Sequence, residues 1–220
     1  MLVVKLNENS LKNSESLNNL KNIVENKSQN SILIVSALKD VNRYLNKMFD
    51  IAIEKGEGYM PLLRKVELIH LDIAKSVLPL NKQTVCISNI KFSISCIENV
   101  LNCMTVLKNS KNSKARSRDY ILSYGELLAS QILESMLDDS IFVDAKDMFV
   151  TDDNFGAASI LRDESEYKIK MALESSNGIS IVNGFSGKTR DGYRARLKRD
   201  VIDQSADLIA YVLNVDVFEI

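Results

Sequence analysis

The sequence predicts an α/β fold, and three neighbouring segments at its start carry that prediction. Residues 2–6 (LVVKL) form a short apolar run that is typical of a buried strand. Residues 31–37 (SILIVSA) form a continuous β-branched run that ends in small residues, as central parallel strands do. Between them, turn formers and possible N-caps precede apolar residues at helical spacing, namely Leu17, Leu20, Ile23 and Val24. Two strands joined by a helix make a βαβ unit, which places the chain in the α/β class.

The segment 41–108 has a helical pattern throughout. One apolar stripe consists of Leu62, Val66, Ile69 and Ile73, and a second consists of Ile90, Ile94, Ile97, Leu101 and Met104. We expect both stripes to face the core rather than an outside partner. His70 lies beside the first stripe and is the only histidine, so we expect a packed or capping residue rather than a catalytic base or metal ligand.

Residues 117–137 predict a helix with a wide apolar face that Gly125 interrupts. A glycine inside a helix costs about 1 kcal/mol relative to alanine, so close packing or the approach of a ligand is its usual reason. Glu126 follows directly and, by its type alone, is a surface acid.

The third quarter of the chain predicts shorter elements. Residues 141–145 (IFVDA) indicate a buried strand, and two apolar pieces around an acidic turn in 147–161 indicate a hairpin. Residues 164–174 have the spacing of an exposed helix, Gly178 is its expected stop, and residues 179–182 begin the next strand.

The last segment, 184–220, predicts a binding site between strand ends. It contains the end of a buried strand, a glycine-punctuated loop, a short arm, a turn carrying Arg199 and Asp203, an apolar helix and a strand. An anion-binding loop followed by a charged pair at a helix entrance suits a phosphate or carboxylate substrate.

Composition excludes several classes of function. The chain has 220 residues, 45% of them hydrophobic, which favours one large domain over two small ones. Its 28 basic and 29 acidic residues leave no overall field for a nucleic acid or a membrane surface, and the basic run 108–118 is typical of a solvated linker.

Cys86, Cys96 and Cys103 have neither metal-site nor redox-pair spacing, and we expect idle thiols in a reducing compartment. No window approaches the roughly 18 apolar residues of a membrane span and no signal peptide is evident, so we expect a cytoplasmic protein.

Five motifs in order resemble the aspartate kinases of the amino-acid kinase superfamily. They are V-K-x-x-x-x-S from Val4, the strand end Ser36-Ala37, R-D-x-x-x-S-x-G-E from Arg118, T-D-x-x-F-G-x-A from Thr151, and G-F-x-G-x-T-x-D-G from Gly184, which continues into L-x-R-x-x-x-D-x-S-A. The resemblance covers nearly the whole chain.

The resemblance implies a three-layer α/β/α sandwich around a mainly parallel sheet, incomplete at its C-terminal end. Residues 1–220 would form a single kinase-like domain with a helical insertion at about 41–112. It also implies ATP-dependent phosphorylation of the L-aspartate β-carboxylate at the start of lysine, threonine and methionine biosynthesis. ATP with Mg²⁺ would be the cosubstrate.

The family's roles carry over where residues match. Lys5 would neutralise charge on the transferred phosphoryl group, and Asp203 would be the catalytic-site aspartate that organises this lysine. Ser36, Glu126 and Arg199 would hold L-aspartate. Glu126 would bind the ammonium group of the substrate, and Arg199 would bind one of its carboxylates. Gly184 and Gly187 would belong to the nucleotide and phosphate loop, and no protein metal ligands are implied.

Two stretches depart from the family pattern. After Lys5, the chain lacks the family's two glycines and threonine, and within Leu197–Asp203 it lacks the glycines of L-G-R-G/N-G-S-D. Glycines let backbone N–H groups approach phosphate oxygens, which the β-branched Val201 and Ile202 do not copy. Glu8 and Asp200 also add negative charge where a triphosphate would lie.

Two functional hypotheses therefore stay open. The first is an aspartate kinase with L-aspartate as its substrate, which would form a homo-oligomer or pair with a separate chain that supplies the nucleotide-binding half. The second is a catalytically inactive remnant or regulatory subunit that binds an amino acid or a full-length kinase partner. Neither hypothesis involves a nucleic acid or a membrane.

Overall fold

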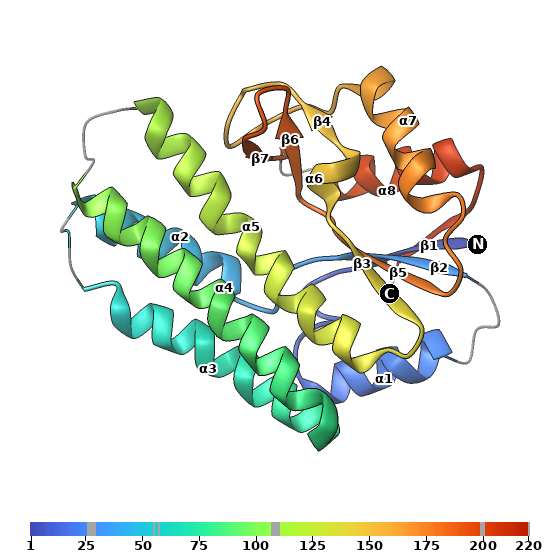
Figure 1. Cartoon of the computed structure of the whole chain (residues 1–220), viewed down its shortest axis with the longest axis horizontal. Coiled ribbons are helices and arrows are strands. Elements are labelled where there is room, and N and C mark those ends of the chain that lie inside the picture. Colours follow the sequence, from blue (N-terminus) through green and yellow to red (C-terminus); the bar gives the residue numbers. More distant parts are fainter. Residues whose placement is uncertain (26–29, 55, 57, 107–110, 199–200, 220) are drawn as a thin grey trace.

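The centre of the molecule is a parallel five-stranded sheet (Figure 1). The computed structural model describes residues 1–25, 30–54, 56, 58–106, 111–198 and 201–219, without the side chains of 106, 111, 112 and 201–203. The strand order is β3-β5-β2-β1-β8, and every neighbouring pair is parallel. The strands are β1 (Leu2–Leu6), β2 (Ser31–Val35), β3 (Ser140–Val143), β5 (Ile179–Asn183) and β8 (Val217–Glu219).

The strand predicted at 31–37 is the central one. All five residues of β2 are buried because helices cover both faces of the sheet, which explains the continuous β-branched run. Ser36 and Ala37 follow the strand and begin the loop at its carboxyl end.

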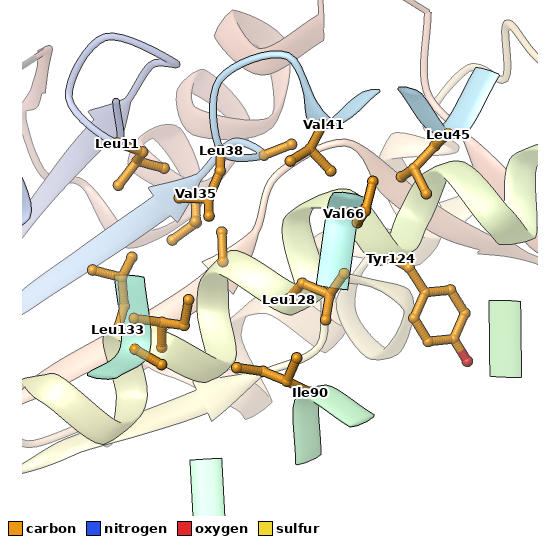
Figure 2. Packing of buried hydrophobic residues seen from close by; sticks show 14 of the residues in the cluster. Leu11, Val35, Leu38, Val41, Leu45, Val66, Ile90, Tyr124, Leu128 and Leu133 are labelled. Carbon is orange, nitrogen blue, oxygen red and sulfur yellow. The ribbon is translucent and has the colours of Figure 1, made fainter. Parts of the chain in front are cut away.

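Five helices cover one face of the sheet. They are α1 (Ser14–Glu25), α2 (Val41–Glu54), α3 (Met60–Val77), α4 (Leu80–Val106) and α5 (Lys111–Met136), and α2 to α5 lie together in Figure 1. Their apolar side chains share one core with this sheet face, and Figure 2 shows Val35 of β2 near Leu38, Leu128 and Leu133. The second predicted stripe is buried as expected.

Three further helices cover the opposite face, namely α6 (Ala145–Met148), α7 (Arg162–Leu173) and α8 (Val201–Leu213). The alternate side chains of the strands, Val3, Ile32 and Ile34, form a second core with residues of these helices, including Ile169 and Ile209. Helices on both faces of a parallel sheet make three layers, so the α/β/α sandwich is confirmed.

A small second sheet lies beside the main one and contains β4 (Val150–Thr151), β6 (Ser186–Thr189) and β7 (Arg194–Arg196). The hairpin predicted for 147–161 is confirmed in part. An antiparallel bridge joins Thr151 to Ile160, the Asp152 N–H donates to the Ser159 carbonyl at 3.1 Å and the Leu161 N–H donates to the Val150 carbonyl at 2.8 Å, while β4 also pairs in parallel with β6. The Val150 N–H donates to Ser165 Oγ of α7 at 3.0 Å.

The prediction for His70 is confirmed. Its ring is fully buried, and Nδ1 lies 2.7 Å from the carbonyl oxygen of Val66, one turn earlier in α3. Burial lowers the pKa of His70 to about 4, so the ring is neutral at physiological pH. By contrast, Ile23 was expected on the buried stripe of α1 and is 41% exposed. Within the described residues, no helix combines the length and the apolar character needed to cross a bilayer.

Candidate functional site

A pocket of about 620 Å³ opens at the carboxyl ends of three neighbouring strands. Ligands of open α/β sheets bind at this edge, because the loops that leave parallel strands converge there. Asn7 and Glu8 follow β1, Ser36 follows β2, and Phe185 follows β5 by two residues. The remaining wall comes from α2, α5 and β7, through Asn42, Arg43, Asn46, Arg118 and Arg196.

Backbone hydrogen bonds align the three strand ends. The Ser36 N–H donates to the Leu6 carbonyl at 3.2 Å, and the Gly184 N–H donates to the Val35 carbonyl at 3.1 Å. Ser36 is buried, and its hydroxyl lies 3.3 Å from the carbonyl oxygen of Ala37. Ser36, predicted from the resemblance to bind substrate, is therefore part of the pocket wall.

Gly125 brings helix α5 against the start of α2. A Cβ at Gly125 would lie 2.4 Å from Asn42 Oδ1 and 3.0 Å from the Ala37 Cβ. Close packing is thus the reason for this glycine, which was one of the two explanations offered by the sequence. The next residue, Glu126, is consequently pressed against Asn42 instead of pointing into solvent.

The expected effect of Gly125→Ala is a loss of stability. Helix propensity alone would give a gain of about 1 kcal/mol, but the added methyl group must displace Asn42, and we expect a net loss of about 1–2 kcal/mol. Urea denaturation of the two proteins measures the difference. A stabilised variant would contradict the close contact between Gly125 and Asn42.

Glu126 is a buried carboxylate with an unused acceptor atom. Its side chain is 1% exposed, Oε1 accepts from Asn42 Nδ2 at 3.3 Å, and Oε2 has no partner among the described residues. Asn42 Oδ1 is buried and equally without a partner. Burial raises the pKa of Glu126 to about 7, and Arg196, Asn42 and Arg194 only partly oppose this shift.

The three arginines of the pocket differ in their engagement. Arg43 is exposed and forms an ion pair with Asp40 at 3.0 Å. Arg118 contacts the carboxylate of Asp50 and lies 3.4 Å from Asn46 Oδ1. Arg196 has no ion pair within 4.0 Å among the described residues and lies over the Phe185 ring, 5.8 Å from its centroid.

Asp119 holds backbone groups behind the pocket wall in place, and the sequence did not identify it as a site residue. It is fully buried, and its Oδ2 accepts from the N–H groups of Gly156 and Arg196, each at 2.8 Å. One carboxylate of the R-D motif therefore joins α5 to the T-D-x-x-F-G-x-A turn and to β7. The only signal for Asp119 in the sequence was its place in the R-D-x-x-x-S-x-G-E motif.

Lys5 lies in β1 with a side chain that is 15% exposed, and its Nζ is 3.5 Å from Glu219 Oε2 on β8. Asn7 also contacts Glu219, through Nδ2 at 3.3 Å. Asn7 Oδ1 accepts from the backbone N–H groups of Asn9 at 2.8 Å and Ser10 at 3.2 Å. In the loop that lacks the family's glycines, the Asn7 side chain therefore accepts hydrogen bonds from two backbone N–H groups of the same loop.

The two glycines of the predicted phosphate loop lie in buried backbone after β5. Gly184 accepts from Ser205 Oγ through its carbonyl oxygen at 3.1 Å. A Cβ at Gly187 would lie 2.6 Å from Thr151 Cγ2 and 2.8 Å from the Phe149 carbonyl oxygen, so packing of β6 on β4 requires this glycine. A role for either glycine in phosphate binding stays a prediction.

Two predicted residues remain, Arg199 and Asp203. Arg199 lies outside the described residues, and Asp203 belongs to α8, with a side chain that is likewise outside them. Among the described residues, Ser36 and Asn42 line the same pocket, and Asn42 donates a hydrogen bond to Glu126. Lys5 lies on β1, the strand next to β2.

Comparisons with known proteins identify the family of the chain. The sequence model described as "Amino acid kinase family" matches residues 1–220. A chloroplastic bifunctional aspartokinase/homoserine dehydrogenase 1 of Zea mays is 24% identical over 204 residues, covering 89% of this chain and 22% of its own length. A bifunctional aspartokinase/homoserine dehydrogenase of Buchnera aphidicola is 24% identical over 232 residues, covering 100% of this chain and 28% of its own.

Solved aspartokinases share the fold. Aspartokinase III of E. coli in complex with lysine and aspartate has a TM-score of 0.86 at 20% identity, and its complex with aspartate and ADP has 0.85 at 21%. Each comparison covers 100% of this chain and 48% or 49% of the other. Aspartate kinase of Clostridium acetobutylicum has a TM-score of 0.76 at 19% identity, covering 99% and 46%. The chain thus spans about half the length of these structures and under a third of the curated relatives.

Proposed function

Because the chain belongs to the amino acid kinase family, we propose that its pocket binds L-aspartate as the acceptor of the γ-phosphoryl group of Mg-ATP. In this reaction a β-carboxylate oxygen of aspartate forms a bond to the γ-phosphorus while the bond to ADP breaks. Aspartate kinase activity at the start of lysine, threonine and methionine biosynthesis is the corresponding proposed role.

The observation that carries the proposal is the pair of buried, unpartnered acceptors beside the pocket. Glu126 Oε2 and Asn42 Oδ1 each lack a hydrogen-bond donor among the described residues. Buried acceptors are normally paired, and leaving one unpaired costs about 1–3 kcal/mol. An ammonium group carries three donors and a positive charge, so the amino group of an amino acid would satisfy both atoms.

Positive charge on the pocket wall suits the carboxylates of the substrate. Arg118 and Arg196 offer guanidinium groups for carboxylates, and Glu8 is the one acid among the residues that line the pocket. The solved relatives support aspartate as the amino acid, since two of them are complexes with aspartate.

The residues carried over from the family complete the proposed site. Mg-ATP would supply the electrophilic phosphorus, with Gly184 and Gly187 near the phosphates. Lys5 at the end of β1 would stabilise negative charge on the transferred group, and Asp203 would orient this lysine. Ser36 and Arg199 would hold aspartate together with Glu126.

A specific observation favours a second candidate, an amino-acid-binding chain that does not transfer phosphate. The Asn7 side chain takes two backbone N–H groups of the loop after β1, and Lys5 is paired with Glu219. Phosphate cradles depend on free backbone N–H groups, so this loop is poorly suited to the task. Such a chain would act as a regulatory subunit or as a partner of a full-length kinase.

Two measurements on the whole chain separate the candidates. Calorimetric titration with L-aspartate, with L-alanine as the control, tests the amino-acid site, and titration with Mg-ATP tests the nucleotide site. Hydroxylamine then traps any acyl phosphate formed from both. Aspartate binding with product supports the kinase, and aspartate binding without product supports the second candidate. Absence of aspartate binding would contradict both.

A further inference from the structure

A second hollow lies between helix α5 and the β6–β7 hairpin, which are neighbours in the fold (Figure 1). It consists of two cavities of about 360 and 480 Å³, and both are lined by Tyr120, Tyr193 and Arg194, so the two cavities form one continuous groove. None of the described residues that line it also lines the pocket at the strand ends. We call this hollow the tyrosine groove.

Two partly exposed tyrosine rings form the apolar part of the tyrosine groove. Tyr120 is 36% exposed, its hydroxyl lies 2.8 Å from that of Tyr124, and the two rings meet edge to face. Tyr193 is 43% exposed, its N–H donates to Thr189 Oγ1 at 3.1 Å, and its carbonyl accepts from the Thr189 N–H at 2.9 Å. The Arg116 guanidinium lies over the Tyr193 ring, 3.2 Å from its centroid. Both rings are therefore held in place and offer surface to a planar group.

Positive charge prevails among the described residues that line the tyrosine groove. The cations are Arg116, Lys146, Lys188 and Arg194, and the acid is Asp144. The chain as a whole has a formal net charge of −1, so this local excess of cations belongs to the groove and not to the surface in general. The groove therefore suits an anionic ligand.

The acids near the groove do not neutralise its cations. Asp144 accepts from both terminal nitrogens of Arg194, at 3.0 and 2.7 Å, and Lys146 Nζ shares the same carboxylate at 3.2 Å. One negative charge thus faces two positive ones. Lys188 forms only a surface ion pair with the exposed Asp147 at 3.4 Å, and such pairs contribute little free energy. Lys146 and Lys188 can therefore exchange these contacts for a ligand.

We propose that the tyrosine groove binds a small molecule in which a planar ring carries a phosphate group, with the ring against Tyr120 and Tyr193 and the phosphate at Lys146 and Lys188. The two lysines line only the larger cavity, whereas the two tyrosines line both, so the ring and phosphate subsites adjoin. Cavities of a few hundred Å³ hold small ligands. Aromatic side chains stack on planar bases, and lysine ammonium groups bind phosphate as compact charges. This site is separate from the pocket proposed for L-aspartate.

The probe for this proposal is adenosine 5′-monophosphate (AMP), because it divides into a ring part and a charged part. Calorimetric titration of the whole chain with AMP, adenosine and inorganic phosphate compares the whole ligand with its parts. We expect AMP to bind at least about tenfold more tightly than either part, since binding of one part holds the other at its own subsite.

The variants are Tyr193→Ala, Lys188→Ala and, as the matched control, Arg190→Ala, which removes an exposed arginine from the same hairpin. For AMP we expect Tyr193→Ala and Lys188→Ala each to bind about tenfold more weakly, since one loses a stacked ring and the other a charged contact. Tyr193→Phe keeps the ring and should bind as the wild type does. Arg190→Ala should bind within about twofold of the wild type.

The two parts of the ligand give the sharper result. Tyr193→Ala should lose affinity for adenosine but not for phosphate, and Lys188→Ala should lose affinity for phosphate but not for adenosine. Equal AMP affinity in the wild type and both groove variants would overturn the proposal. AMP binding that is lost in Lys5→Ala and kept in both groove variants would also overturn it, and would place AMP at the proposed nucleotide site.

Failure of this proposal differs from failure of the proposed function. A wild-type chain that binds no AMP removes the ligand of the tyrosine groove and leaves the L-aspartate pocket unaffected. The contacts of Tyr193 with Thr189 come from its main chain, so we expect Tyr193→Ala to fold, and thermal denaturation verifies this. If Tyr193→Ala is unfolded, Tyr193→Leu gives the same comparison.

Discussion

Replacing Glu126 by glutamine is expected to make the ligand-free protein more stable at pH 8. The pKa of this buried carboxyl is raised from 4.5 to about 7, so its ionisation destabilises the folded state at neutral and alkaline pH. A difference of this size corresponds to about 3 kcal/mol. Glutamine keeps the shape and the Asn42 contact without the charge, and its amide can donate to the unpartnered Asn42 Oδ1.

The direction of the pH dependence follows from the raised pKa. Between about pH 4.5 and pH 7 the folded state binds more protons than the unfolded state, so the free energy of unfolding falls as pH rises. Above pH 7 this contribution is constant. The gain from Glu126→Gln should therefore be small near pH 4 and should reach its full size above pH 7.

Urea denaturation at pH 5 and pH 8 measures this effect. The control is Glu15→Gln, which removes the same formal charge from the exposed surface of α1. We expect the control to change the free energy of unfolding by at most about 0.5 kcal/mol at either pH. A Glu126→Gln protein that is less stable than the wild type at pH 8 would contradict the buried, unpartnered carboxylate.

The same substitution should weaken aspartate binding, which is the functional reason for retaining a destabilising group. An ammonium bound to ionised Glu126 gains a charge-assisted contact that the neutral amide replaces poorly, and we expect about a 100-fold loss of affinity. Stability and binding then change in opposite directions in one variant, as they do where a site is prepared for a ligand at the expense of the fold. Titration of both proteins with L-aspartate at pH 8 tests this.

The α/β class and the buried faces of single elements were predictable from the sequence because their signals are local. The β-branched run of β2 requires burial on both faces, and the stripe from Ile90 to Met104 requires one buried helix face. Each signal lies within one element and needs no knowledge of its neighbours. The resemblance to the aspartate kinases supplied the three-layer arrangement around a mainly parallel sheet, which periodicity leaves open.

The details of the site depend on contacts between distant segments, which local patterns do not contain. Glu126 has the residue type of a surface acid, and only the approach of Asn42, 84 positions earlier, places it in the interior. Arg196 is one of several arginines in a basic stretch until the pairing of β6 with β7 directs it to the pocket. The local pattern at 147–161 predicted the antiparallel bridge of Thr151 to Ile160, but not the parallel partner of β4, which comes from 186–189.

Asp119→Ala is expected to be the most destabilising single substitution at the site. The Asp119 carboxylate accepts two backbone N–H groups through one oxygen, and its removal leaves the amides of Gly156 and Arg196 without this acceptor. Each lost contact to a charged acceptor costs about 1.5–3 kcal/mol, so we expect a total loss of about 3–6 kcal/mol. This loss is a large part of the stability of a typical domain.

The matched variant is Asp119→Asn, which keeps an acceptor oxygen at the same place. Burial raises the pKa of Asp119, which shows that the charge itself is costly there, so its removal should partly offset the weaker hydrogen bonds. We therefore expect Asp119→Asn to stay within about 1 kcal/mol of the wild type in urea denaturation.

The two Asp119 variants also separate stability from positioning. Asp119 accepts a hydrogen bond from the backbone N–H of Arg196 and so helps to position the Arg196 side chain in the pocket. Asp119→Ala should therefore weaken binding of L-aspartate even at temperatures where the variant is fully folded. Asp119→Asn should bind L-aspartate nearly as the wild type does, because its oxygen still fixes that amide. Equal aspartate affinity in the folded Asp119→Ala protein would show that β7 holds Arg196 in place without this carboxylate, and that the anchor serves the fold alone.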